Sequence, residues 1–287
     1  MKVFLGVDMT DKKNPVASDV SVFKTKELSQ ISKEALQTSY DQMDDVQQKA
    51  SLPKVLKIAL YVFGLAFAIC LVGLVRSMDD VSLATAYQNA PFIFWIGGVS
   101  GILCLCLYLY GRYRVKVVAQ DEKTGHVLNR LGSAVDNAFD ELGVPADASY
   151  FDVLCFRYVI KNGNAEFKDV ISGCRAAIPF EFKAYTNGQN LCLADPEQVL
   201  EIPLSCFEKI TTTNKRIMLN TWNKTEPFKK GVYANYNIKS IDGNPAFKPY
   251  HVLHFCHNGE KWGIYFPCYE LPVIEKLTGL VAEQEEK

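Results

Sequence analysis

The sequence predicts an α+β protein that combines a two-helix transmembrane hairpin with a cytoplasmic unit of short antiparallel strands and a C-terminal helix. Three observations carry this prediction: two long apolar runs, a series of short alternating segments after residue 145, and an amphipathic pattern near the C-terminus. The net charge of −1 gives no global bias toward nucleic acid. The apolar runs lead us to expect a membrane as partner, and the near-neutral charge leads us to expect no nucleic acid.

The two apolar runs are Val55–Val75 and Phe92–Tyr110, and Lys57 is the one charged residue within them. Each run has about the 20 residues that a helix needs to cross a hydrocarbon core about 30 Å thick. A buried helix pair in a large soluble core is the alternative, which the charges at both ends of the runs disfavour. The sequence thus predicts a transmembrane hairpin over residues 55–111, with spans 55–75 and 92–110.

The charges that flank the spans predict the orientation of the hairpin. The loop over residues 77–91 carries Asp79 and Asp80. Basic residues lie at the start of the first span and follow the second: Lys49, Lys54, Lys57, Arg112, Arg114 and Lys116. Because basic residues favour the cytoplasmic side, both termini are expected in the cytoplasm of a multi-pass protein of the cell membrane.

Small residues in both spans predict that the two helices pack on each other. Gly64 and Ala68 form a small-xxx-small pair in the first span, and Gly97 and Gly101 form a G-x-x-x-G motif in the second. Such pairs let two backbones approach closely in a membrane. The centres of the spans hold no Asp, Glu, His or Arg, so we expect an anchor and not an ion pathway.

The segments on either side of the hairpin are expected to differ in order. Residues 1–24 lack periodicity and are expected to be flexible. Residues 25–52 are expected to form a cytoplasmic helix capped by Thr25, serving as a coiled-coil seam or docking on the protein's own cytoplasmic domain. Residues 115–144 are expected to form a juxtamembrane helix that Gly143 ends.

Residues 145–287 read as a separate domain of strands. Asn-Gly pairs, the preferred residues of tight hairpin turns, separate several of its alternating segments. The expected strands are 151–160, 179–186, 190–194, 199–202, 216–222, 250–256 and 261–266. A helix over residues 271–282 is expected to close the domain.

This domain resembles the PH-like (pleckstrin-homology-like) domain that some bacterial membrane proteins place behind a two-span hairpin. The resemblance rests on YTNGQNLCL at residues 185–193, LEIPLS at residues 200–205 and the helix that follows Phe266–Pro272. It implies an antiparallel barrel or sandwich with a C-terminal helix, and binding of a lipid headgroup or a protein. Another α+β architecture is the alternative that these residues leave open.

The motifs of common enzymes are absent from the sequence. It contains no phosphate-binding loop, dinucleotide fingerprint, zinc-protease motif or nucleophile elbow, and we expect no enzyme and no cofactor. The best metal candidates are His251, His254, Cys256 and His257. On a strand these side chains alternate between two faces, so no metal site is expected from them.

A local excess of basic residues lies between Glu208 and Lys239, where Glu226 is the one other acidic residue. We call these basic residues the basic patch: Lys209, Lys215, Arg216, Lys224, Lys229, Lys230 and Lys239. In a membrane-anchored domain the basic patch could face anionic lipid headgroups or a protein partner. A solvated surface balanced by the acidic C-terminal tail is the alternative.

Three functions follow from these features as expectations. The first is a membrane-anchored interaction module whose PH-like domain binds a protein partner or anionic headgroups. The second is an accessory subunit that joins a larger membrane complex through the hairpin. The third, for which no catalytic constellation can be assembled, is an enzyme acting on a membrane substrate.

Overall fold

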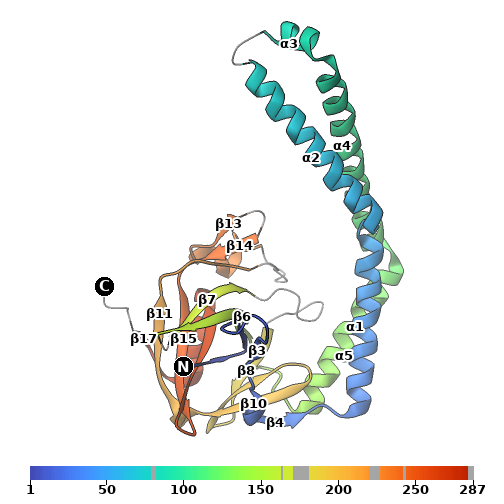
Figure 1. Cartoon of the computed structure of the whole chain (residues 1–287). Helices are drawn as coiled ribbons and strands as arrows, with labels where there is room; N and C mark the ends of the chain where they lie inside the picture. Colours follow the sequence, from blue (N-terminus) through green and yellow to red (C-terminus); the bar gives the residue numbers. More distant parts are fainter. Residues whose placement is uncertain (79–81, 163, 171–180, 220–226, 242–243, 284–287) are drawn as a thin grey trace. The chain divides into compact units, whose positions relative to one another are not determined.

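The computed structural model describes residues 1–287 except 79–81, 163, 171–180, 220–226, 242–243 and 284–287 (Figure 1). It is a mixed α+β structure of two compact units. The sheet unit comprises Met1–Gln37 and Ser133–Lys287, and the hairpin unit comprises Thr38–Gly132. The chain leaves the sheet unit within helix α1 (Gln30–Ala50) and returns to it within helix α5 (Glu122–Leu142).

The hairpin unit is helical throughout its regular part. Besides the adjoining parts of α1 and α5, its helices are α2 (Lys54–Met78), α3 (Leu83–Asn89) and α4 (Pro91–Gln120). Pro53 separates α1 from α2, as expected for a residue that cannot donate the backbone hydrogen bond of a helix interior. The predicted spans lie inside α2 and α4, which extend beyond them.

The juxtamembrane helix differs from the prediction at its start. Residues 115–120 continue α4, and the break comes at Asp121, whose backbone is extended (φ −70°, ψ 127°). The Asp121 side chain accepts a hydrogen bond from the backbone N–H of Lys123 at 3.1 Å. This bond caps the first turn of α5. Apolar residues recur at helical spacing both before and after Asp121, so the pattern did not reveal where one helix ends and the next begins.

The central sheet of the sheet unit has five strands in the order β1-β16-β15-β11-β17. These strands are β1 (Lys2–Phe4), β16 (Glu260–Pro267), β15 (Tyr250–His257), β11 (Phe207–Thr213) and β17 (Ala282–Glu283). The middle strands β15 and β16 are antiparallel, while β1 and β17 join the two edges in parallel. Both ends of the described chain are therefore held in one sheet.

Both faces of the central sheet are buried. Along β15, Leu253 and Phe255 belong to one apolar core and Tyr250 and Val252 to another. Along the neighbouring strand, the side chain of Tyr265 faces the second of these cores. This alternation follows from the period of two in a strand, and it explains why most side chains of the two central strands are buried.

The other sheets cover these two faces. A second five-stranded sheet, in the order β4-β10-β9-β8-β5, contributes to the first core. Its strands are β4 (Lys24–Glu27), β10 (Gln198–Pro203), β9 (Asn190–Ala194), β8 (Glu181–Thr186) and β5 (Ser149–Asp152). Helix α6 (Leu271–Thr278) adds Ile274 to the same core.

Two smaller sheets contribute to the second core. One consists of β3 (Val16–Ala17), β2 (Gly6–Asp8), β6 (Phe156–Lys161) and β7 (Asn164–Val170), in that order. The other, the three-stranded sheet, consists of β12 (Ile217–Met218), β14 (Asn244–Phe247) and β13 (Lys239–Ile241), in that order. Within the described residues every sheet is open, so a closed barrel is not formed.

The N-terminal segment corrects the expectation of a flexible residue range 1–24. Residues 2–4 pair in parallel with residues 262–264, and the side chains of Val3 and Phe4 are fully buried. Three-residue strands carry no periodicity that a sequence can reveal. Their stability comes from partners more than 200 residues away, which local patterns do not show.

The expected helix over residues 25–52 is also shorter than predicted. Thr25 lies in β4, which pairs with β10, and its hydroxyl donates to the Glu201 carboxylate at 2.9 Å. Thr25 is therefore not a helix cap, and α1 begins at Gln30. The sheet unit includes residues 1–37 and 133–144, so it is larger than the domain predicted over residues 145–287.

We expect Phe4→Ala to lower the free energy of unfolding by about 3–5 kcal/mol, as for other buried Phe side chains. The ring of Phe4 lies 5.9 Å from Phe23 and 6.4 Å from Phe255, between ring centroids. The measurement is urea unfolding of the full chain in detergent, followed by tryptophan fluorescence. Val16→Ala, at a side chain that is 64% exposed, is the matched control. Equal stability of both variants would contradict the packing of β1.

Candidate functional site

Two helices of the hairpin unit are long and apolar enough to cross a membrane, Lys54–Arg76 and Pro91–Gln120. Their apolar side chains are largely exposed: Tyr61 is 77% exposed, Ile102 64% and Leu65 64%. Water cannot stabilise so continuous an apolar surface, whereas lipid chains can. The surface of these helices is therefore the candidate functional site.

The two helices pack antiparallel through the glycines of α4. A Cβ atom placed on Gly97 would lie 3.0 Å from the Cβ of Cys70, and one placed on Gly101 would lie 2.9 Å from the ring of Phe67. On the opposite helix, a Cβ atom at Gly64 would lie 3.7 Å from the Sγ of Cys104. The absence of a side chain at the two α4 positions thus permits the observed approach of the backbones.

Ala68, which the small-xxx-small pattern predicted to pack in this interface, is not the residue that Gly97 or Gly101 meets. Its side chain is exposed, whereas Cys70 meets Gly97 and Phe67 meets Gly101. Large and small residues interdigitate here, so a pattern of small residues on one helix alone could not identify its partners. From Gly97 through Gly101 to Cys104, the facing residues on α2 run backwards from Cys70 through Phe67 to Gly64, as in an antiparallel pair.

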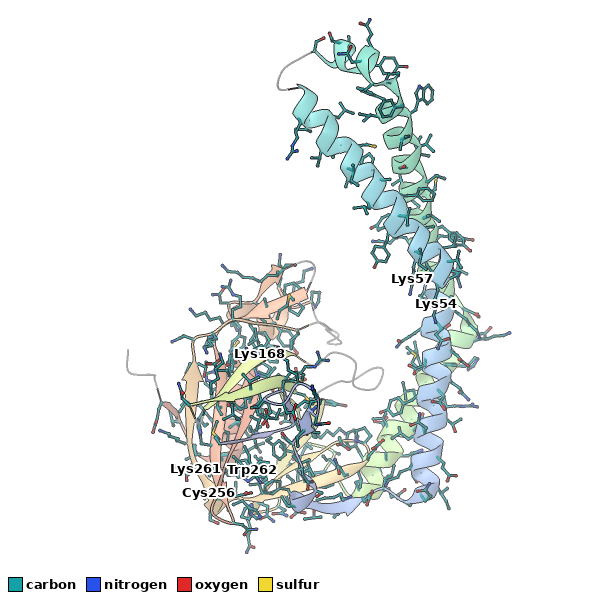
Figure 2. The ribbon with its side chains drawn as sticks, viewed as in Figure 1. Lys54, Lys57, Lys168, Cys256, Lys261 and Trp262 are labelled. Carbon is teal, nitrogen blue, oxygen red and sulfur yellow. The ribbon has the colours of Figure 1, made fainter. Side chains whose placement is uncertain are left out.

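The hairpin has a basic end, which we call the basic collar: Lys49, Lys54, Lys57, Arg112, Arg114 and Lys116. Leu52 packs against Gly111, so the start of α2 and the end of the apolar part of α4 lie side by side. The guanidinium of Arg114 donates a hydrogen bond to the backbone carbonyl of Lys49, across the same junction. Figure 2 marks Lys54 and Lys57 at the start of α2.

Aromatic side chains lie near both ends of the two apolar helices. Tyr108 and Tyr113 lie near the basic collar and are 51% and 64% exposed, while Trp95, at the other end, is 67% exposed. The rings of Tyr87 and Phe94 pack edge to face at that end, 5.2 Å apart. Aromatic rings prefer the two interfaces of a bilayer, so this distribution fits a membrane-spanning pair.

The structure divides the basic patch between two places. Lys209 lies on β11 and forms an ion pair with Glu283, with 3.5 Å between Nζ and Oε2. It stands four residues before Thr213, or about 13 Å along an extended strand. Lys215 and Arg216 lie beyond that end of the strand. Lys209 is therefore separate from Lys215 and Arg216.

Three of the remaining basic residues flank the three-stranded sheet. Lys215 and Arg216 immediately precede β12, and Lys239 begins β13 on the opposite edge. Lys229 and Lys230 lie in the chain between these strands, and all five side chains are exposed. Lys224 lies outside the described residues. Sequence spacing could not show which of these basic residues lie close together. β12 and β13 share a sheet only because both pair with β14, which comes after them in the chain.

The histidine-rich strand β15 offers no metal site among the described residues. The imidazole of His254 shares a 2.7 Å hydrogen bond with Thr211, and that of His251 shares a 3.1 Å hydrogen bond with Thr212. Both partners lie on β11, which runs antiparallel to β15. These histidines therefore join two central strands.

Comparison with known proteins found no match: no family model, no curated protein and no solved structure is detectably similar to this chain.

We expect Gly64→Cys to form a disulfide with the native Cys104 under mild oxidation, because the two positions face each other across the helix interface. The measurement is peptide mass spectrometry of the full chain after oxidation in membranes. Gly73→Cys, at a position with no atom within 4 Å, is the control and should leave Cys104 free. Cross-linking of Gly73→Cys in place of Gly64→Cys would contradict the observed register.

We also expect the free energy of unfolding to decrease as the pH falls below 6.5. Burial lowers the pKa of His251 below that ordinary value, so the unfolded chain binds a proton that the folded chain does not. The decrease should stop once the pH falls below the pKa of the folded state. Above pH 6.5 both states hold a neutral imidazole, and this contribution vanishes.

Urea unfolding of the full chain between pH 5 and pH 8 measures this dependence. His251→Gln should weaken it but not abolish it, because burial also lowers the pKa of His254. The Gln amide can still bond Thr212 but does not titrate. His126→Gln is the control, because the His126 side chain is 77% exposed. A pH dependence that is the same in both variants would show that His251 does not cause it.

Proposed function

We propose that this chain is a membrane-anchored interaction protein. In this proposal α2 and α4 span the cell membrane as a hairpin, and both termini and the sheet unit lie in the cytoplasm. The sheet unit then binds a protein partner or anionic lipid headgroups at the membrane surface. The hairpin serves as the anchor.

One observation carries the proposal: an exposed apolar helix pair with six basic residues at one end. From Lys57 to Arg76 the first helix covers about 29 Å at a rise of 1.5 Å per residue. From Phe92 to Arg112 the second covers about 30 Å. Both lengths match the hydrocarbon core of a bilayer. The basic collar would then lie at the cytoplasmic headgroups, as the positive-inside rule requires.

The proposed role of the sheet unit rests on its resemblance to PH-like domains and on its charge. The central and second sheets share one apolar core with a helix near the C-terminus, an arrangement in keeping with a PH-like sandwich. The basic side chains around the three-stranded sheet offer a surface for an acidic partner. A catalytic role has no motif in its support.

An accessory subunit of a larger membrane complex is the second candidate function. A specific observation favours it: Cβ atoms placed on Gly73 and Gly98 would meet no atom within 4 Å. These glycines are small residues on helix surfaces that a further helix could approach closely. Loss of a native-size complex in Gly98→Leu, with the hairpin still inserted, would favour this candidate over the first.

We expect the full chain to resist extraction from membranes by alkaline carbonate, because about 20 apolar residues in each helix would be transferred to water. Trypsin added to sealed right-side-out vesicles should leave the sheet unit intact, and trypsin added to inverted vesicles should digest it. Detergent-opened vesicles serve as the control for protease activity. Extraction by carbonate would contradict insertion, and digestion in right-side-out vesicles would contradict the orientation.

A further inference from the structure

We propose that the basic collar, and not the basic patch, is the site at which this chain binds the phosphate group of an anionic phospholipid. Arg112 and Lys116 of α4 are its principal ligands. This inference rests on the proposed function, because the collar reaches lipid headgroups only when the hairpin spans a bilayer.

The first support is the charge of this region. The sequence holds no Asp or Glu from Val46 to Met78 or from Pro91 to Gln120. Asp45 is the last acidic residue before the first of these intervals. Within the described residues, the collar side chains form no ion pair with a carboxylate. A positive surface whose basic side chains form no ion pair favours an anionic ligand.

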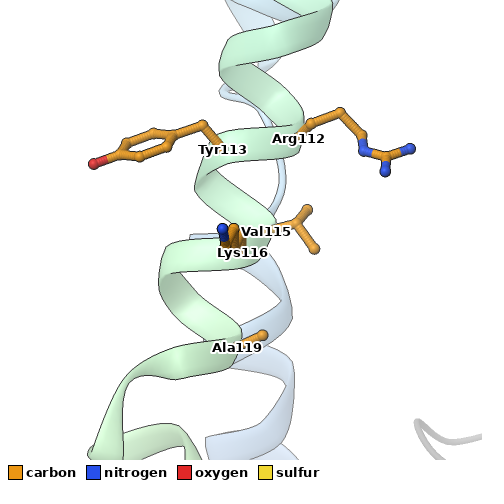
Figure 3. A pocket seen from close by; sticks show the side chains of 5 residues that line it. All are labelled: Arg112, Tyr113, Val115, Lys116 and Ala119. Carbon is orange, nitrogen blue, oxygen red and sulfur yellow. The ribbon is translucent and has the colours of Figure 1, made fainter.

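The second support is the geometry of one face of α4. Arg112 and Lys116 are four residues apart, so their side chains lie about 40° apart around the helix. Val115 and Ala119 lie on the same side, and Tyr113 lies at its edge. These five residues line an open hollow of about 620 Å³. Figure 3 shows Lys116 between Tyr113 on one side and Arg112 on the other.

The basic residues of this part of α4 differ in their existing partners, and Arg114 lies on the side of the helix opposite to Arg112. The guanidinium of Arg114 is directed to the carbonyl of Lys49 and so stabilises the junction of the helices. Arg112 makes one long contact, 3.4 Å from Nη1 to the hydroxyl of Tyr108, and retains further N–H donors. Lys116 is exposed. A guanidinium and an ammonium one turn apart match the oxygen atoms of a phosphate diester.

The third support is depth along the helix. Arg112 follows the apolar part of α4, about 30 Å from its other end at Phe92. Leu109, which is 55% exposed, lies about one turn nearer the membrane centre than Arg112 and would contact the apolar part of a lipid at the interface. The exposed Tyr113 ring suits the same depth. Phosphate, glycerol and the upper acyl chain would thus meet side chains of fitting polarity.

The basic patch fits this ligand less well. Lys209 already pairs with Glu283, and Lys215 lies close enough to Glu166 to lower the pKa of that carboxyl, after the stronger effects of Lys161 and Lys168. The patch is thus partly neutralised by the sheet unit itself. We assign lipid binding to the collar, which leaves the three-stranded sheet for a protein partner.

The test measures which lipids the full chain retains. The chain is purified from mixed micelles of equal phosphatidylglycerol and phosphatidylcholine, and the retained lipids are quantified by mass spectrometry. We expect phosphatidylglycerol to be enriched over the bulk ratio. In Arg112→Gln/Lys116→Gln the enrichment should return to the bulk ratio, because two basic contacts to the headgroup, each worth about fivefold in binding, are lost.

Lys215→Gln/Arg216→Gln is the matched control, since it removes the same two kinds of charge from the basic patch. It should leave the enrichment unchanged. An undiminished enrichment in the collar variant, or a loss confined to the patch variant, would overturn the inference. Displacement of the retained lipid by millimolar inorganic phosphate would overturn its assignment to a membrane lipid.

Membrane insertion is scored separately on each variant by carbonate extraction, which also shows whether the variant folds into the membrane. A wild-type chain that is extracted would overturn the proposed function. A wild-type chain that stays inserted but shows no enrichment would overturn only the lipid site. Loss of enrichment in an inserted collar variant supports both.

Discussion

The close approach of α2 and α4 at Gly97 and Gly101 is the contact on which the candidate site depends. With no side chain at these positions, the backbones can pack against Phe67 and Cys70 without a clash. The antiparallel register set by this contact brings Leu52 beside Gly111, and hence the two groups of basic residues to one end. A hairpin in another register would separate these charges along its length.

The sheet unit depends on a different constraint, the burial of both faces of its central sheet. Strands β15 and β16 present successive side chains to two cores, so each face needs a cover. Segments from both ends of the described chain help to meet this need. The N-terminal strand β1 contributes Phe4 to one core and Val3 to the other. Residues before the hairpin thus belong to the same fold as residues after it.

Prediction from the sequence succeeded where a single segment held enough residues to show its own pattern. The two apolar helices are long, and the strands β9, β15 and β16 are rich enough in apolar residues, and bounded clearly enough by turns, to be located within one or two residues. The Asn258-Gly259 turn was also readable, because both residues tolerate the positive φ values observed there, 50° and 76°. The short strands β1, β2 and β4 gave no such signal, since pairing with distant strands is what stabilises them.

The sequence by itself determined that the chain carries two helices long and apolar enough for a bilayer, with basic residues at their shared end. These properties follow from composition along one continuous segment. Only the tertiary structure decided which residues meet across the hairpin, that Ala68 is exposed, and that Lys209 stands apart from Lys215. The physical reason is that register and strand order depend on contacts between distant segments, which no local pattern encodes.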